Sequence, residues 1–444
     1  MSCSEWKEVK LIDAVEMNPR TILKKGTLAK KVSMQDIAEF TRKIQSYEIA
    51  EFTSGSKFKS GDTLFARITP CLENGKTAYV DILEDDEVAF GSTEFIVFRA
   101  KEGITDGKFV YYLTISPEFR NIAIKSMTGS SGRQRVQNDV LANTIINLPP
   151  LQEQKRIAHL LSVIDDKIEL NNEMNKTLEE IAQAIFQRWF VDFEFPNANG
   201  EPYKSSGGKL VESELGMIPE GWKVGNFRNL TENVIGGDWG KESPQGNYIK
   251  EVYCLRGTDI PEISIGRDGA LPKRYILERN FNNKKLNNGD LVVEISGGSP
   301  TQSTGRITYV NEEVLSKFQM GVVCTNFCRA INLINKKFTE FFYFYWKKLY
   351  DERVFFQYEN GTTGIKNLDI NSFLDKYMIV IPDDSIIQSF HSVTSTFLRK
   401  IQENGIESKK LVTIRDTLLP KLMSGEIRVV DAEREVEACL QKSS

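Results

Sequence analysis

The sequence is poor in the residues that bind metals and form disulfides. It has two histidines and six cysteines in 444 residues. Six irregularly spaced cysteines in a chain of this size do not make a disulfide framework. Cys324 and Cys328 are the only close pair, and with so few histidines they cannot complete a zinc ligand set. We therefore expect both to lie in the core of a strand.

Long apolar runs and common catalytic motifs are also missing. There is no run of about eighteen apolar residues, and MSCSEWKEVK lacks the apolar segment of a signal peptide, so we expect a cytoplasmic protein. The motifs GxGxxG, GxxxxGK[ST], GxSxG and HExxH do not occur, which argues against dinucleotide-binding, P-loop, hydrolase and zincin sites. An amino-methyltransferase would need Asn or Asp before Pro-Pro and an aromatic residue after it. The only Pro-Pro pair, Pro149-Pro150, lies between two leucines.

One nuclease-like spacing is present. Pro382-Asp383 is followed by Glu407-Ser408-Lys409, which resembles the carboxylate and lysine set that holds Mg²⁺ in nucleases. Because Glu407 and Lys409 fall within a predicted long helix and not on adjacent strands, we interpret this match as accidental. The sequence therefore predicts no catalytic, cofactor-binding or metal site on this chain.

The charge balance gives a further constraint. The chain has 57 Lys and Arg against 61 Asp and Glu, a formal net charge of −4. A protein that binds nucleic acid by itself is usually basic, because phosphate neutralisation supplies most non-specific affinity. If this chain holds DNA, it must concentrate positive charge locally or rely on partner subunits.

A long helix is predicted from Leu151 to Phe190. Apolar residues recur there at the a and d positions of a seven-residue repeat, and Pro149-Pro150 stops the preceding strand. At about 1.5 Å per residue the helix would span about 58 Å, which is too long for one apolar stripe to remain without a partner.

The partner lies in the same chain, because Ser385–Met423 repeats the pattern. The resemblance extends upstream: TGSSG at 128–132 aligns with NGTTG at 360–364, and SGDTLFARI at 60–68 with NGDLVVEI at 288–295. The chain is thus two copies of a globular domain followed by a long helix, and such a duplication has approximate two-fold symmetry available to it. The predicted seam residues are Leu161, Ile164, Ile168, Asn171, Asn175, Leu178, Ile185, Phe397, Ile401, Asn404, Ser408, Leu411, Leu418 and Leu422. Asn171, Asn175, Asn404 and Ser408 would meet near its middle and fix the register of an antiparallel pair.

Polar, glycine-rich loops recur in both copies just before the long helices. Thr, Ser, Gln, Asn, Arg and Lys are the residue types that reach phosphate oxygens and base edges. On one loop alone, an ordinary solvent-facing connection would be the better interpretation, but recurrence favours a working surface. The candidate DNA-contacting residues are Arg67, Lys76, Thr128, Ser130, Ser131, Arg133, Gln134, Arg135, Thr301, Gln302, Ser303, Thr362, Thr363, Lys366 and Asn367. The aromatic segment Thr339–Phe356 is predicted to be a buried helix and not a base-stacking platform.

Four segments resemble conserved regions of one family. PLQEQKRIAHLL (150–161), QRWFVDFEFP (187–196), GMIPEGWKV (216–224) and RDTLLPKLMSGEI (415–427) look like those of the specificity subunit of type I restriction and modification enzymes. The resemblance implies two target-recognition domains, each reading half of a split double-stranded DNA site, held by an antiparallel coiled coil. It also implies that two methyltransferase subunits and the restriction subunits dock on this scaffold. S-adenosylmethionine, ATP and Mg²⁺ would bind those partners and not this chain.

The expected fold class is α+β with a pseudo-two-fold internal repeat. The expected ranges are a first recognition domain at 1–148, a long helix at 149–190, a linker at 191–217, a second recognition domain at 218–381, a second long helix at 382–424 and a tail at 425–444. EISGGSPTQSTG in the second copy departs from ARITPCLENGKT in the first, so the two half-sites should differ. Two alternatives stay open: a stand-alone nuclease or methyltransferase, and a coiled-coil adaptor between proteins.

Overall fold

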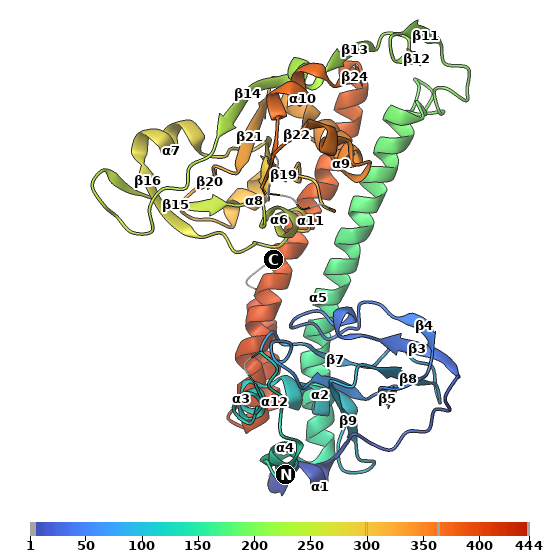
Figure 1. Ribbon diagram of the computed structural model, residues 1–444, viewed down its shortest axis with the longest axis vertical. Helices are drawn as coiled ribbons and strands as arrows, with labels where there is room; N and C mark the ends of the chain where they lie inside the picture. Colours follow the sequence, from blue (N-terminus) through green and yellow to red (C-terminus); the bar gives the residue numbers. More distant parts are fainter. Residues whose placement is uncertain (1–5, 131, 298, 300, 362–364, 442–444) are drawn as a thin grey trace. The chain divides into compact units, whose positions relative to one another are not determined.

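The computed structural model of the protein describes residues 6–130, 132–297, 299, 301–361 and 365–441 (Figure 1). The chain divides into two compact units, unit 1 with residues 1–168 and 410–444 and unit 2 with residues 169–409. Both long helices, α5 (Leu151–Phe186) and α11 (Asp384–Ser424), contribute to both units. The units therefore differ from the ranges expected from the sequence: each unit combines a recognition domain with parts of both long helices.

Unit 1 is built from one two-stranded and two four-stranded sheets. Their strand orders are β1-β10, β2-β9-β6-β7 and β4-β3-β8-β5. The elements are β1 (Lys7–Lys10), α1 (Leu11–Ala14), β2 (Val15–Met17), β3 (Leu28–Val32), β4 (Glu48–Glu51), β5 (Ser56–Lys59), β6 (Thr63–Ala66), β7 (Thr77–Tyr79), β8 (Val88–Gly91), β9 (Phe95–Ala100), α2 (Gly107–Ile115), α3 (Pro117–Lys125), α4 (Asn138–Ala142), β10 (Ile145–Leu148) and α12 (Val429–Gln441).

Unit 2 repeats this plan and adds two small sheets. Its sheets are β13-β24, β14-β21-β17-β19 and β16-β15-β20, with β11-β12 and β18-β23-β22 in addition. The elements are β11 (Leu210–Ser213), β12 (Gly216–Pro219), β13 (Lys223–Asn226), β14 (Thr231–Gly236), β15 (Tyr248–Leu255), α6 (Ile260–Ser264), β16 (Lys273–Leu277), α7 (Glu278–Lys284), β17 (Asp290–Glu294), β18 (Ser296–Gly297), β19 (Ile307–Val310), α8 (Glu312–Ser316), β20 (Val322–Cys324), β21 (Cys328–Leu333), α9 (Thr339–Asp351), β22 (Glu359–Asn360), β23 (Lys366–Leu368), α10 (Ile370–Lys376) and β24 (Met378–Ile381).

The match between the units extends to strand direction. β3 pairs antiparallel with β4 and parallel with β8, just as β15 pairs antiparallel with β16 and parallel with β20. β1 and β10 pair antiparallel, as do β13 and β24. The internal repeat inferred from sequence is therefore a repeat of fold, and the α+β class is confirmed.

The starts of the long helices have identifiable causes. Gln154 is fully buried, donates to the Pro149 carbonyl at 2.8 Å and accepts from the Asp106 amide at 3.0 Å, which ties the first turn of α5 to α2. At α11, the Asp383 carboxylate accepts from the amides of Ser385 and Ile386 at 2.8 and 3.1 Å, satisfying amides that have no partner within the helix.

The long helices run antiparallel within each unit. In unit 1, Asp165 pairs with Arg415 at 2.8 Å, while Glu153, three turns earlier on α5, pairs at 2.8 Å with Arg428, four residues beyond the end of α11. In unit 2, Asn175 bonds to the Ile401 carbonyl at 3.2 Å, and the ring of Phe186 lies 6.3 Å from that of Phe390. The predicted antiparallel pairing is therefore observed separately in both units.

Each core uses the long helices as one wall. In unit 1, Leu161 of α5 and Leu422 of α11 are fully buried in one cluster with Phe65 and Phe98 of the sheet. In unit 2, α9 supplies a run of aromatic residues to the core, and Phe341 and Trp346 are fully buried. The predicted aromatic helix is therefore buried, but it ends at Asp351, before the left-handed residue Arg353 (φ 61°).

The close cysteine pair lies where the sequence predicts. Cys324 ends β20 and Cys328 begins β21, and both side chains are buried. Burial raises the pKa of both thiols to about 12, so they stay protonated and apolar in character.

Candidate nucleic-acid interface

The polar loop of unit 1 forms a hairpin on the carboxyl end of β6. The amides of Thr128 and Arg135 donate to each other's carbonyls at 3.0 and 2.9 Å, which closes the hairpin. Arg135 forms a β-bridge with Ile68, and the Thr69 amide donates to the Gln134 carbonyl at 3.0 Å. The hairpin thus extends the central sheet at the place where β6 ends.

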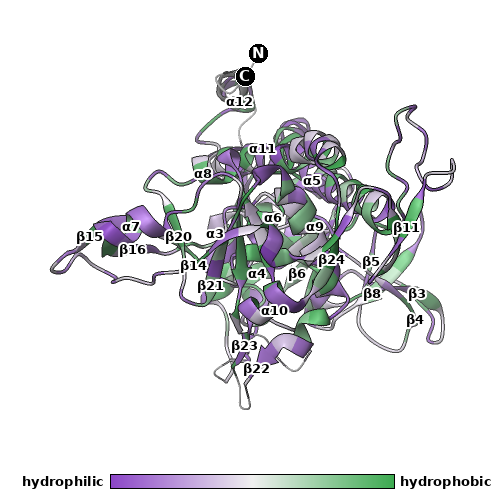
Figure 2. Cartoon of the chain, turned by 90° about the horizontal axis from the view of Figure 1, so that it is seen from above, coloured by the Kyte–Doolittle hydropathy of each residue, from purple (hydrophilic) through white to green (hydrophobic). Residues whose placement is uncertain are grey.

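The polar loop of unit 2 occupies the same place. β22 and β23 form a hairpin in which Asn360 pairs with Asn367, and Asn367 pairs with Ser296 just beyond β17. Figure 2 shows β22 and β23 at the margin of unit 2, beside α10. Since β17 is the counterpart of β6 in the repeated sheet, the two hairpins are structurally equivalent. Their recurrence is a property of the fold and not of composition alone.

The arginines of the first hairpin differ in how they are engaged. Arg135 forms a two-pronged ion pair with Glu94, with Nε–Oε2 and Nη2–Oε1 distances of 2.9 and 2.6 Å. The hydrogen bond from Arg135 lowers the pKa of Glu94. Arg133 is exposed, and its guanidinium has no hydrogen bond or ion pair to the described part of the chain. Arg133 is therefore the hairpin arginine whose charge is not already paired with a carboxylate.

The other candidates of unit 1 make contacts within the unit. The Arg67 guanidinium lies 3.4 Å from the Val136 carbonyl, and its Nε is buried without a partner among the described residues. Lys76 donates to the Met34 carbonyl at 2.8 Å, and the Thr128 hydroxyl accepts from Gln137. Ser130 and Gln134 contribute to the hairpin through their backbone carbonyls, while Ser131 lies outside the described residues.

The candidates of unit 2 are similarly divided. Lys366 pairs with Glu359 at 2.9 Å and lies 4.5 Å above the Phe356 ring. Ser303 is only 4% exposed, so its side chain does not face solvent as the sequence-based assignment required. Asn367 and the loop residues Thr301 and Gln302 are exposed. Thr362 and Thr363 lie outside the described residues.

Sequence reasoning missed several residues beside these hairpins. Glu94 was overlooked because its partner Arg135 lies 41 residues further along the chain. Phe327 and Ile365 were overlooked because apolar residues were assigned to the core, yet they are 61% and 62% exposed. The sequence did contain a signal: in the alignment of the two copies, Phe327 falls opposite Glu94, and Ile365 falls opposite Arg133.

All fourteen predicted seam residues are buried or partly buried. Those that are buried are Leu161, Ile164, Asn171, Asn175, Ile401, Asn404, Leu411, Leu418 and Leu422. Those that are partly buried against a core cluster are Ile168, Leu178, Ile185 and Phe397, and Ser408 is half-buried.

The four polar seam residues meet within unit 2. The Asn171 amide donates to the Glu407 carboxylate at 2.9 Å and lies 3.2 Å from the Ser408 hydroxyl. The Asn404 amide donates to Asn175 Oδ1 at 2.8 Å. A one-turn slip of either helix would remove these partners from buried amides, so the contacts specify one register.

The nuclease-like residues do not form a site. Glu407 accepts from Asn171, Lys409 pairs with Asp268, and Asp383 caps the start of α11. Asp383 and Glu407 are 24 residues apart at the start and within the body of one helix, roughly 36 Å at 1.5 Å per residue. Among the described residues, no group of three or more His, Cys, Asp or Glu side chains could hold a metal ion.

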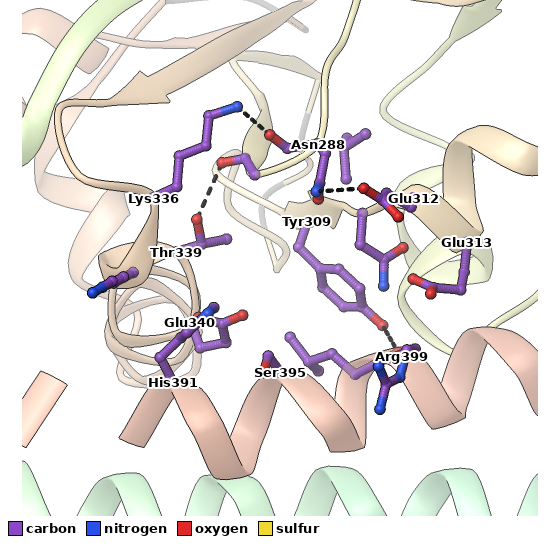
Figure 3. A pocket seen from close by; sticks show the side chains of 15 residues that line it. Asn288, Tyr309, Glu312, Glu313, Lys336, Thr339, Glu340, His391, Ser395 and Arg399 are labelled. Carbon is purple, nitrogen blue, oxygen red and sulfur yellow. Dashed lines mark hydrogen bonds and ion pairs between the residues drawn. The ribbon is translucent and has the colours of Figure 1, made fainter. Parts of the chain in front are cut away.

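Unit 2 contains a pocket of about 360 Å³ between α9, α11 and the loop before β17 (Figure 3). His391 Nδ1 lies 2.7 Å from Glu340 Oε2, and this hydrogen bond raises the pKa of His391. Lys336 donates to the Asn288 carbonyl, and Tyr309 donates to the Leu398 carbonyl at 3.2 Å. These bonds join the surrounding elements, so we assign the pocket a structural role.

Within residues 6–441, apart from the gaps given above, no helix has the length and apolar character needed to cross a membrane.

Two equivalent α+β units, each presenting a polar hairpin at the same strand end and sharing two long helices, define a duplicated recognition scaffold. The family model for the type I restriction modification DNA specificity domain matches residues 3–180 and again residues 219–412. The chain therefore belongs to this family and carries two copies of its domain. Membership makes it a DNA specificity component of a type I restriction-modification system.

Individual relatives agree with this assignment. The chain is 28% identical over 413 residues to the type I restriction enzyme HindI specificity subunit of Haemophilus influenzae, covering 83% of this chain and 87% of that protein. It is 27% identical over 334 residues to the MjaIX specificity subunit of Methanocaldococcus jannaschii, covering 74% and 71%. The crystal structure of a type I restriction-modification S subunit from M. genitalium matches with a TM-score of 0.57 at 14% identity, covering 94% of this chain and 96% of that chain. That last similarity shows the fold.

Proposed function

We propose that each unit of this chain reads one half of a bipartite DNA site through its hairpin and the adjoining strand end. The observation that carries the proposal is the structural equivalence of the two hairpins, both attached to the carboxyl end of the same strand of the repeated sheet. Surface loops placed at equivalent positions by rigid sheets are typical recognition elements. The side chains of the two hairpins differ, which favours two half-sites of different sequence.

The partners we propose are two methyltransferase subunits, with restriction subunits joining them. Two equivalent units suit two copies of one partner, because a repeated surface offers each copy the same contacts. S-adenosylmethionine, ATP and Mg²⁺ would be bound by those subunits. The relatives supporting this are named as specificity subunits of type I restriction enzymes.

The net charge supports shared binding of DNA. At −4 the chain lacks the basic excess expected of a lone DNA-binding protein. Methyltransferase subunits would then supply much of the phosphate contact, while this chain supplies sequence discrimination.

The test is to co-express the chain with a candidate methyltransferase subunit, purify the complex and map methylated bases across a genome. We expect a motif with two specified blocks separated by a fixed, unspecified gap. The methyltransferase without this chain is the control and should leave the motif unmethylated.

Two outcomes would contradict the proposal. Methylation or Mg²⁺-dependent cleavage by the purified chain alone would indicate a stand-alone enzyme. A complex that forms but methylates no defined motif, with partner binding indifferent to DNA, would indicate a protein adaptor.

A further inference from the structure

The two units can be compared residue by residue at the proposed reading surface. In unit 1 the Arg67 amide donates to the Glu94 carbonyl at 2.9 Å, and the Arg67 carbonyl accepts from the Val136 amide at 2.9 Å. In unit 2 the Ile295 amide donates to the Phe327 carbonyl at 2.8 Å, and the Ile295 carbonyl accepts from the Leu368 amide at 2.8 Å. These bonds make Phe327 the counterpart of Glu94.

The hairpin register extends the comparison. Arg135 bridges to Ile68, and Asn367 pairs with Ser296, the residue that follows Ile295 as Ile68 follows Arg67. Counting back two residues along each hairpin, Ile365 is the counterpart of Arg133. Unit 1 therefore presents Glu94 and Arg133 at the two positions where unit 2 presents Phe327 and Ile365.

The apolar pair of unit 2 faces solvent. Phe327 is 61% exposed and Ile365 is 62% exposed. Phe327 is bonded to Ile295, the residue after β17, while Ile365 precedes Lys366, which pairs with Gly297 of β18. Their neighbours Asn326, Lys366 and Asn367 are polar. Two exposed apolar side chains are too few for a protein-binding patch but sufficient to contact single bases.

The charges around this surface favour a polyanion. Glu294 forms a two-pronged pair with Arg306 at 2.7 and 2.6 Å, and Glu359 pairs with Lys366. These carboxylates are therefore neutralised within the unit. Arg329 bonds only to the carbonyls of Asn326 and Cys328 within the described part of the chain, so its positive charge is not cancelled by a carboxylate.

We propose that unit 2 recognises thymine in its half-site, with the exposed side chains of Phe327 and Ile365 each contacting a C5-methyl group in the major groove. The C5-methyl of thymine is the apolar group that the major groove offers, and a phenyl ring is among the side chains suited to it. Arg329 beside Phe327 would contact a phosphate and hold the ring in place. Unit 1, with Arg133 in the equivalent position, would read a hydrogen-bonding base edge instead.

This inference rests on the proposed function, and one experiment distinguishes a failure of the inference from a failure of the proposed function. Once the bipartite motif is mapped, the complex with its methyltransferase subunits is titrated against duplexes in which single thymines are replaced by deoxyuridine. That replacement removes the methyl group and leaves every hydrogen-bonding group unchanged. Burial of one methyl group predicts about a fourfold loss of affinity at one or two positions of the second half-site.

The variants F327A and I365A connect the effect to these side chains. Each should weaken binding to the thymine duplex by a similar factor and remove the sensitivity to deoxyuridine at its own position. Because both side chains are largely exposed, the unit should still fold. The matched control is I334A, which removes a side chain 66% exposed at the opposite end of β21 and should leave the deoxyuridine sensitivity unchanged.

Three outcomes would overturn the inference. The wild-type complex could bind the mapped site but ignore deoxyuridine throughout the second half-site. The sensitivity could persist unchanged in both F327A and I365A. Either variant could instead release the methyltransferase subunit, which would make this surface a protein contact. Failure of the wild-type complex to bind any bipartite site would refute the proposed function itself.

Discussion

At the scale of single residues, the reading surface depends on which charged groups are already paired. Arg133 and Arg135 lie two residues apart in one hairpin, but among the described residues only Arg135 is paired with a carboxylate, that of Glu94. A paired arginine orients the hairpin, whereas an unpaired and exposed one can reach a base or a phosphate. The same distinction separates Lys366, paired with Glu359, from the exposed Asn367 in unit 2.

Replacement of Arg133 by alanine should alter recognition of the first half-site only. If the guanidinium contacts a guanine edge, discrimination at one position should fall by about 1 to 3 kcal/mol. Binding of the complex to duplexes with single base changes in each half-site measures this, and the second half-site serves as the internal control. A uniform loss on all sequences, together with a shallower salt dependence, would instead make Arg133 a phosphate contact.

At the scale of elements, the helix pair contains a buried ion pair that the apolar seven-residue pattern does not predict. Arg415 occupies a seam position but pairs with Asp165 at 2.8 Å, and Tyr112 donates to the same carboxylate at 2.7 Å. The Asp165 and Arg415 side chains are only 4% and 12% exposed. Their counterparts in the other repeat are Leu398 and Ala182, both buried in the apolar core of unit 2. At the same position of the repeat, unit 1 thus has a buried ion pair and unit 2 has two apolar side chains.

The single variant D165L should destabilise unit 1 strongly, by about 3 to 5 kcal/mol, because it removes the buried carboxylate that pairs with Arg415 and accepts from Tyr112, and leaves Arg415 with the exposed Asp416. The double variant D165L/R415A copies the residues found in unit 2 and removes both charges. It should be less destabilised than D165L, and denaturant unfolding of the four proteins of this cycle measures the difference. Additive losses in the double variant would show that the ion pair has no coupling energy.

At the scale of the whole molecule, each long helix belongs to both units. α5 and α11 are continuous across the boundaries at residues 168–169 and 409–410. The polar contacts of Asn171, Asn175 and Asn404 specify their register close to these boundaries. We therefore propose that helix length sets the number of unread base pairs between the half-sites.

Inserting seven residues into each helix at these boundaries should lengthen the gap and leave both half-sites unchanged. Seven residues preserve the a and d pattern and add about 10 Å, which corresponds to about three base pairs. Genome-wide mapping of methylated sites reads the gap directly. The control carries the same seven residues in the connector between Asn199 and Gly200, where the gap should not change. An unaltered gap in the helix variant would refute the spacing role.

The sequence by itself determined the duplication, the antiparallel helix pair, the burial of α9 and the membership of the family. These follow from periodicity and from comparison of the chain with itself, which depend on residues close together or in register. The tertiary structure alone decided which polar side chains are engaged, because Glu94 meets Arg135 across 41 residues and Asp165 meets Arg415 across 250. It also decided that Ser303 is buried while Phe327 and Ile365 are exposed. Exposure is set by the neighbours that folding brings together, and residue type alone does not contain that information.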